Sequence, residues 1–176
     1  VVRSLIELGA DVSMATVNCG TPLWIAAQKG HETIVRALIE AGADVNKAMD
    51  NGMTPLYIAA ENGHETVVRS LIELGADVSM ATVNGRTPLI FAAQKGHETV
   101  LRALIEAGAD VNKAIDDGTT PLYIAAREGH EASVRTMIEA DADVNKAVDE
   151  DVTPLFIATE KEYAAIVQII RDAGAV

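Results

Sequence analysis

A Thr-Pro-Leu triplet recurs along the chain at a constant step of 33 residues, and this period constrains the fold more than any other feature. The triplets begin at Thr21, Thr54, Thr87, Thr120 and Thr153. Gly-His pairs and Gly-Ala-Asp triplets keep the same step, and no insertion breaks the register. Self-similarity at such a period is typical of proteins built from stacked repeats. We therefore expect a row of similar units.

Each unit is predicted to contain two short helices. Thr54 can cap a helix through its hydroxyl, and Pro55 suits the first helical position, where a missing N–H costs nothing. Gly63 tolerates a positive φ and ends this helix. A second helix is expected from about Glu65 to Gly75, with apolar residues at helical spacing and charged residues on its outer face.

The segment that links one helix pair to the next is expected to be an extended arm with a tight turn. Residues 76–86 contain β-branched side chains and an Asn84-Gly85 pair. Isolated helices of about eight to ten residues are marginal in water, so each unit persists only by stacking on its neighbours. The predicted fold class is all-α, a solenoid of helix-turn-helix units with β-hairpin-like loops.

A 33-residue helix pair that carries Thr-Pro-Leu, Gly-His and Gly-Ala-Asp-Val-Asn resembles the ankyrin repeat family, and the resemblance covers essentially the whole chain. It implies a single array over residues 1–176. The expected division is a partial repeat at 1–15, full repeats at 16–48, 49–81, 82–114 and 115–147, and a capping-like repeat at 148–176. It also implies a non-catalytic protein–protein interaction module or scaffold.

Two departures from the family pattern bear on stability. The family usually has His after Thr-Pro-Leu, but this chain has Trp24, Tyr57, Ile90, Tyr123 and Phe156 there. The family's hydrogen bonding between repeats through that imidazole is therefore in doubt, and packing is expected to carry more of the contact. Asp141 replaces a capping glycine, which should cost about 1 kcal/mol because a left-handed backbone strains a residue with a Cβ.

The two ends of the sequence differ in character. Arg171 stands where the earlier repeats have Ile, so we expect the stack to stop there. Apolar residues at the start, such as Leu5 and Ile6, would lack an inner helix to cover them, so we expect an excerpt from a longer array. Residues 1–66 match 67–132 at about 54 positions. Tandem duplication explains this match, and a designed sequence would also do so.

Composition excludes several classes of partner. The net charge is −12 and the pI is 4.6, so the overall field repels phosphate backbones and anionic lipids. No stretch approaches the length of apolar residues that spans a bilayer. The lone Cys19 cannot form an internal disulfide, so a reducing, intracellular and cytoplasmic setting is expected.

The sequence gives no sign of an enzyme, a metal site or a cofactor. His31, His64, His97 and His130 follow the period, whereas a catalytic residue is needed once. The position that a zinc-binding HExxH helix would require holds an aliphatic residue in every copy, and no phosphate-binding glycine motif is present. We expect no catalytic residue and no small-molecule ligand, and we interpret Cys19 as a tolerated substitution in a turn.

In the ankyrin family, partners lie along the loop tips and the exposed face of the inner helices. Carried over position by position, the candidate partner-binding residues are Asn18, Gln28, Lys29, Asp50, Asn51, Met53, Glu61, Asn62, Asn84, Arg86, Gln94, Lys95, Asp116, Asp117, Thr119, Arg127, Glu128, Asp149 and Glu150. These positions vary most between otherwise similar copies, although surface drift explains that equally well. Because the loop tips grow more acidic toward the C-terminus, we expect a partner protein with a basic or polar contact segment.

Two other functions remain open at this stage. The array could be a structural or regulatory spacer within a larger multidomain protein, or an engineered repeat scaffold. A spacer predicts no partner for the isolated array.

Overall fold

The computed structural model describes residues 9–14, 20–148 and 152–175. Within these residues the chain forms helices and loops, with no β-strand. The helices are α2 (Pro22–Gln28), α3 (Glu32–Glu40), α4 (Pro55–Glu61), α5 (Glu65–Glu73), α6 (Pro88–Lys95), α7 (Glu98–Glu106), α8 (Pro121–Glu128), α9 (Glu131–Glu139), α10 (Pro154–Glu160) and α11 (Ala164–Asp172).

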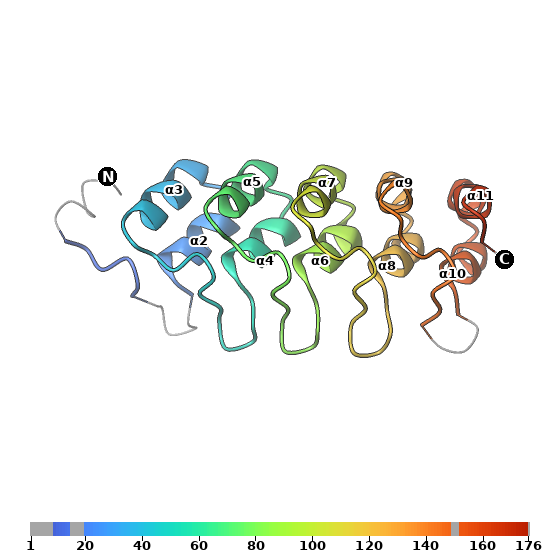
Figure 1. The fold of residues 1–176 in the computed structure, drawn as a ribbon, viewed down its shortest axis with the longest axis horizontal. Coiled ribbons are helices and arrows are strands. Elements are labelled where there is room, and N and C mark those ends of the chain that lie inside the picture. The colour runs from blue at the N-terminus through green and yellow to red at the C-terminus, as the bar shows by residue number, and fades with distance from the viewer. Residues whose placement is uncertain (1–8, 15–19, 149–151, 176) are drawn as a thin grey trace.

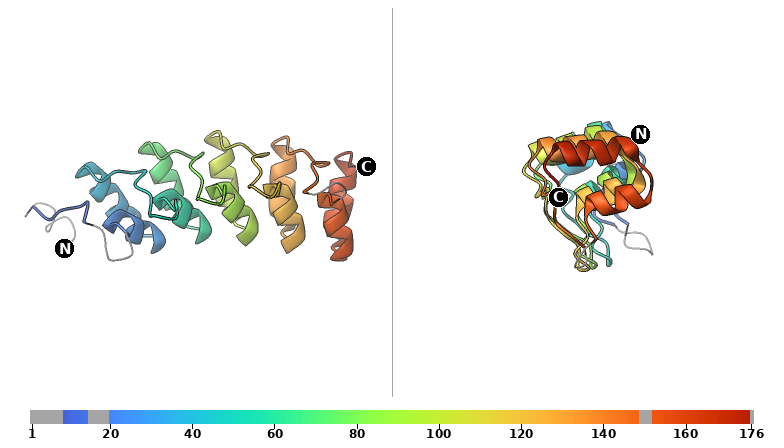
Figure 2. Two further views of the ribbon diagram at one scale, coloured as in Figure 1. Left: turned by 90° about the horizontal axis from the view of Figure 1, so that it is seen from below. Right: turned by 90° about the vertical axis from the view of Figure 1, so that its right-hand side faces the viewer.

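The helices pack in two parallel rows. The inner helices α2, α4, α6, α8 and α10 form one row, the outer helices α3, α5, α7, α9 and α11 form the other, and long loops project on one side (Figure 1). Viewed along the stack, successive helix pairs lie almost behind one another, with a slight fan seen from below (Figure 2). The predicted all-α solenoid is confirmed.

Each inner helix starts as its sequence predicts. The Thr54 hydroxyl accepts a hydrogen bond from the Tyr57 amide at 3.1 Å, and Pro55 is the first helical residue. Thr21, Thr87, Thr120 and Thr153 cap their helices in the same way. A cap of this kind contributes about 1 kcal/mol to a short helix.

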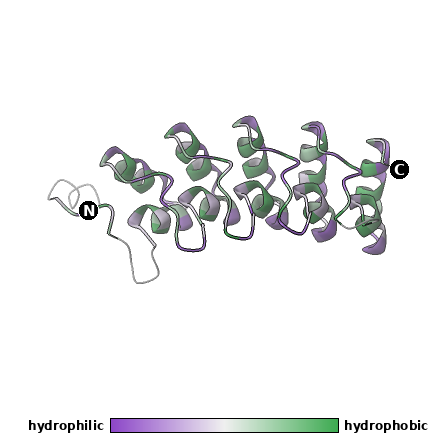
Figure 3. Ribbon diagram, turned by 60° about the horizontal axis from the view of Figure 1, so that its bottom comes forward, coloured by the Kyte–Doolittle hydropathy of each residue, from purple (hydrophilic) through white to green (hydrophobic). Residues whose placement is uncertain are grey.

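Alanine lets the two rows approach closely. Ala59 and Ala60 have no exposed surface, and Leu56 and Leu71 fill the space between the rows. The apolar sides of the helices face each other while their polar sides face outward (Figure 3). None of the helices in the described residues has the length and apolar character of a membrane-spanning helix.

A histidine at the N-cap of the outer helices α5, α7 and α9 bridges to the preceding repeat. His97 Nε2 lies 3.0 Å from the Glu61 carbonyl, which can only accept, so Nε2 carries the proton. The imidazole lies against Gly63, where a Cβ would come within 2.8 Å of the ring. His64 and His130 repeat both contacts, on the carbonyls of Gln28 and Gln94.

This contact revises the expectation that packing replaces the family's imidazole hydrogen bond. The residues after Thr-Pro-Leu do lack an imidazole, but the histidines of the Gly-His pairs join the repeats instead. In the last repeat, Tyr163 lies over Gly129, where a Cβ would come within 2.9 Å of its ring. The expectation considered one histidine position and missed the other.

Arginines on the charged outer face form ion pairs both within one helix and between neighbouring repeats. Arg36 pairs with Glu32 of its own helix at 3.0 Å and with Glu73 of the next repeat at 2.7 Å. Arg69 repeats the pattern with Glu65 at 3.0 Å and Glu106 at 3.1 Å. Exposed ion pairs contribute about 0 to 1 kcal/mol each, so this ladder adds modestly to stability.

The repeat that contains α8 and α9 carries two local defects. Asp141 has a φ of 62°, which confirms the left-handed conformation expected at this cap. Ser133 Oγ is buried without a hydrogen-bond partner, at a position where the other repeats have Val or Ile. Glu162 also has a positive φ, 60°, at the position where the earlier repeats have glycine.

Candidate protein-binding surface

The loops and the inner helices together present one surface, which we call the inner face. The loops extend past the row of inner helices, so their tips and the exposed sides of these helices lie along the length of the stack (Figure 1). Those predicted partner-binding residues that the structure describes lie on these elements. Asn18, Asp149 and Glu150 are outside the described residues.

Most of the described candidates are accessible. Exposed side chains are those of Lys29, Asp50, Asn51, Asn62, Asn84, Lys95, Asp116, Asp117 and Glu128. Half-buried ones are those of Gln28, Met53, Glu61, Arg86, Gln94 and Arg127. Thr119 is 5% exposed, so its side chain offers almost no contact surface.

Neighbouring loops support one another at their tips. The Val83 amide donates a hydrogen bond to the Asn51 carbonyl at 3.1 Å. A Cβ on Gly52 would come within 2.8 Å of Thr82 Cα, so only glycine permits this approach. Loops held in this way lose less conformational entropy when a partner binds.

An open hollow of about 340 Å³ lies between the loops at 49–53 and 82–86. Its walls are Asn51, Met53, Tyr57, Thr82, Val83, Asn84, Arg86 and Phe91. Val83 is 69% exposed at its edge. The hollow therefore offers the exposed Val83 side chain beside polar groups, whereas the Tyr57 and Phe91 rings, 3% and 9% exposed, support its wall with little contact surface of their own.

Arg86 is held in place at the floor of the hollow. Its guanidinium lies 5.2 Å from the centre of the Phe91 ring and donates a hydrogen bond to Gln94 Oε1 at 3.2 Å. The Phe91 and Tyr57 rings are tilted against each other with centroids 4.3 Å apart. Arg86 keeps further N–H donors for a carboxylate or carbonyl of a partner.

Tyr57 remains a neutral phenol. Burial raises the pKa of its hydroxyl, the Glu61 carboxylate raises this pKa further, and the Arg86 charge lowers it. The raised pKa keeps the proton on the oxygen throughout the neutral range. The hydroxyl therefore adds a neutral donor to the wall of the hollow.

The loop at 115–119 carries two aspartates, Asp116 and Asp117, in different surroundings. Asp117 accepts a hydrogen bond from the Thr119 amide at 2.9 Å and so holds the turn. Hydrogen bonds from Thr119 lower the pKa of Asp117 and keep its carboxyl ionised. Asp116 is exposed and has no hydrogen bond or ion pair to any residue in the described part of the chain.

Sequence reasoning missed Phe91 as part of this surface. Each other repeat has Ile at the equivalent position, so Phe91 is a single departure from the period. That departure was the available signal. Phe91 matters to this surface because the Arg86 guanidinium lies above its ring. No other repeat has arginine at the position of Arg86.

Nothing on the described surface resembles a metal centre. Among residues 9–14, 20–148 and 152–175, no three His, Cys, Asp or Glu side chains are arranged to hold an ion. The histidines that could serve are at 31, 64, 97 and 130, in different repeats, and the last three each lie against a glycine of the preceding repeat.

Comparison with known protein families identifies the repeats. A family model described as ankyrin repeats in three copies matches residues 1–82, 50–115, 74–148 and 113–176. These matches overlap and together extend over the chain. No curated protein matches the sequence significantly.

Proposed function

Because the chain belongs to the ankyrin repeat family, whose repeats are generally protein–protein interaction modules, we propose that it binds a partner protein along the inner face. The observation that carries the proposal is the hollow between the loops at 49–53 and 82–86. It combines the exposed Val83 side chain with the fixed Arg86 guanidinium, which two largely buried aromatic rings support. Tyr, Trp and Arg dominate the energetics of protein interfaces, which supports this location.

The partner is proposed to be a protein with a basic or polar contact segment. The chain has a net charge of −12, which steers cationic partners toward it. Asp116 is exposed at a loop tip, without an ion pair among the described residues, and it can meet a basic side chain directly. Arg86 adds a local preference for a carbonyl or carboxylate within the same segment.

The hollow can be tested with a variant that preserves the repeat pattern. Arg86→Thr with Phe91→Ile replaces both residues by those at the equivalent positions of the next repeat, Thr119 and Ile124. The helices and the loop should therefore keep their structure. Affinity capture from a lysate, quantified by mass spectrometry, should show partners that the wild-type chain enriches and this variant loses at least tenfold.

The charge proposal needs a separate pair of variants. Asp116→Lys should weaken the same interactions, whereas Glu40→Lys makes an equal charge change on outer helix α3 and should not. Circular dichroism should show equal helix content for both. Partners captured equally by the wild-type chain and every variant would refute the inner face as the binding surface. A chain that enriches no protein would refute the binding function itself.

A further inference from the structure

An asparagine side chain ties some neighbouring repeats together at the loop that follows the outer helix. Asn112 Oδ1 accepts a hydrogen bond from the Asp143 amide at 2.8 Å, and Asn112 Nδ2 donates one to the Asp141 carbonyl at 3.3 Å. Asn46 makes the same two bonds to the Asp77 amide, at 2.9 Å, and the Gly75 carbonyl, at 3.3 Å. A primary carboxamide thus bridges both interfaces.

The interface between these two lacks this bridge, because serine replaces asparagine at position 79. The Ser79 hydroxyl turns back to Asp77 Oδ1 of its own loop at 2.6 Å. The groups that a carboxamide would meet here are the Asp110 amide and the Gly108 carbonyl, the counterparts of those at 143 and 141. Within the described residues neither group has a hydrogen-bond partner.

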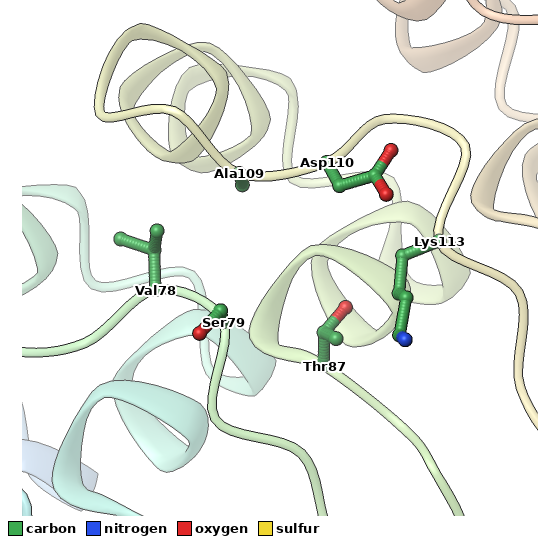
Figure 4. A pocket seen from close by; sticks show the side chains of 6 residues that line it. All are labelled: Val78, Ser79, Thr87, Ala109, Asp110 and Lys113. Carbon is green, nitrogen blue, oxygen red and sulfur yellow. The ribbon is translucent and has the colours of Figure 1, made fainter.

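A cavity of about 310 Å³ lies at this interface, with Ser79 and Asp110 among its lining residues. Val78 and Ala109 line it from the two loops, and Ser79, Thr87, Asp110 and Lys113 complete it (Figure 4). A similar cavity of about 240 Å³ lies at the interface of Ser13, which is the other serine at this position in the described residues. The cavity at Ser79 shares no lining residue with the hollow of the inner face.

We propose that the Ser79 cavity binds the primary carboxamide of an asparagine or glutamine side chain from a partner protein. The bridged interfaces supply the template, because the same backbone groups there hold a carboxamide oxygen and nitrogen. A primary carboxamide presents its oxygen and its N–H side by side. A trans peptide bond points them in opposite directions and cannot make both bonds. The geometry of the site therefore selects a primary carboxamide over a trans peptide bond.

The test is an NMR titration of the isotope-labelled chain with N-acetyl-asparagine methylamide. The Asp110 amide signal should shift and saturate, whereas N-acetyl-alanine methylamide, which has backbone amides alone, should leave it in place. The Asp143 amide is an internal control, because Asn112 already occupies its hydrogen bond. This readout does not depend on any partner of the inner face, so either proposal can fail without the other.

Two variants at one position complete the test. Ser79→Asn supplies the carboxamide from within the chain, so the probe-induced shift of Asp110 should disappear and hydrogen exchange at this amide should slow severalfold. Ser79→Ala leaves the cavity open and should keep the shift. The proposal fails if the alanine probe gives the same shift, if Asp143 shifts equally, or if Ser79→Asn still responds.

Discussion

The contact between the glycine that follows an inner helix and the histidine of the next repeat can be tested at Gly96. A Cβ at this position would lie 2.6 Å from His130 Nδ1, which is closer than a Cβ atom approaches a non-bonded atom. The residue also has a φ of 71°, so Gly96→Ala incurs both a backbone cost and a steric cost. Gly108 has a φ of 87°, and a Cβ added there would meet no atom within 4 Å, so Gly108→Ala incurs the backbone cost alone.

The two costs can be sized separately. A left-handed alanine costs about 1 to 2 kcal/mol, and the stiffer unfolded chain returns about 0.4 to 1 kcal/mol. Gly108→Ala should therefore destabilise by about 1 kcal/mol. Gly96→Ala adds about 1 to 3 kcal/mol for overpacking and about 1 kcal/mol if His130 is pushed off the Gln94 carbonyl. Its total should be about 3 kcal/mol or more.

The assay is urea unfolding followed by far-UV circular dichroism, with the midpoint and slope fitted for each variant. His130→Ala makes room for the new methyl group, so the double variant Gly96→Ala/His130→Ala should cost about 1 to 3 kcal/mol less than the sum of the single variants. The reasoning is refuted if Gly96→Ala costs no more than Gly108→Ala, or if the two changes at 96 and 130 are additive.

Three further outcomes are expected from the same unfolding assay. Asp141→Gly should stabilise the chain by about 1 kcal/mol, because glycine adopts the observed φ of 62° without strain, and an unchanged midpoint would contradict this. Ser133→Val should stabilise by about 1 to 2 kcal/mol, since it removes a buried hydroxyl that has no partner, and a loss of stability would show that the hydroxyl is satisfied. Hydrogen bonds from Arg36, and to a smaller extent from Ser70, lower the pKa of Glu32 below 4.5. The unfolded chain therefore binds more protons than the folded chain, and stability should fall as the pH drops below about 4.5. Glu32→Gln should flatten that fall, and an unchanged pH profile would exclude the carboxylate as a contributor.

The helices could be predicted from the sequence because their signals are local. A threonine followed by proline starts each inner helix, and glycine or its substitute at 141 ends the outer ones, so short stretches of chain carry the information. The contacts between repeats could not be predicted in this way. Whether the imidazole of His97 reaches the Glu61 carbonyl depends on the rise and twist of the stack, which no single unit defines.

The same distinction applies to the candidate site. Placement on loop tips and inner helices was carried over from the ankyrin resemblance, and the candidates among the described residues lie on those elements. The hollow depends on how Arg86 and Phe91 meet across a helix and a loop, and the burial of Thr119 depends on how its turn closes. Such details depend on side-chain packing between segments. The repeating sequence pattern describes what the units share and does not contain this information.

The bonds from His64, His97 and His130 to the preceding repeats give these three interfaces a direction. One side of a helix pair offers a carbonyl and a bare glycine, and the other side offers an imidazole. A pair copied in tandem therefore meets both neighbours with matching halves, as residues 1–66 and 67–132 illustrate. Such an array can lengthen by whole units that repeat this contact at the new junction, whereas an insertion of any other length would leave a carbonyl facing no imidazole.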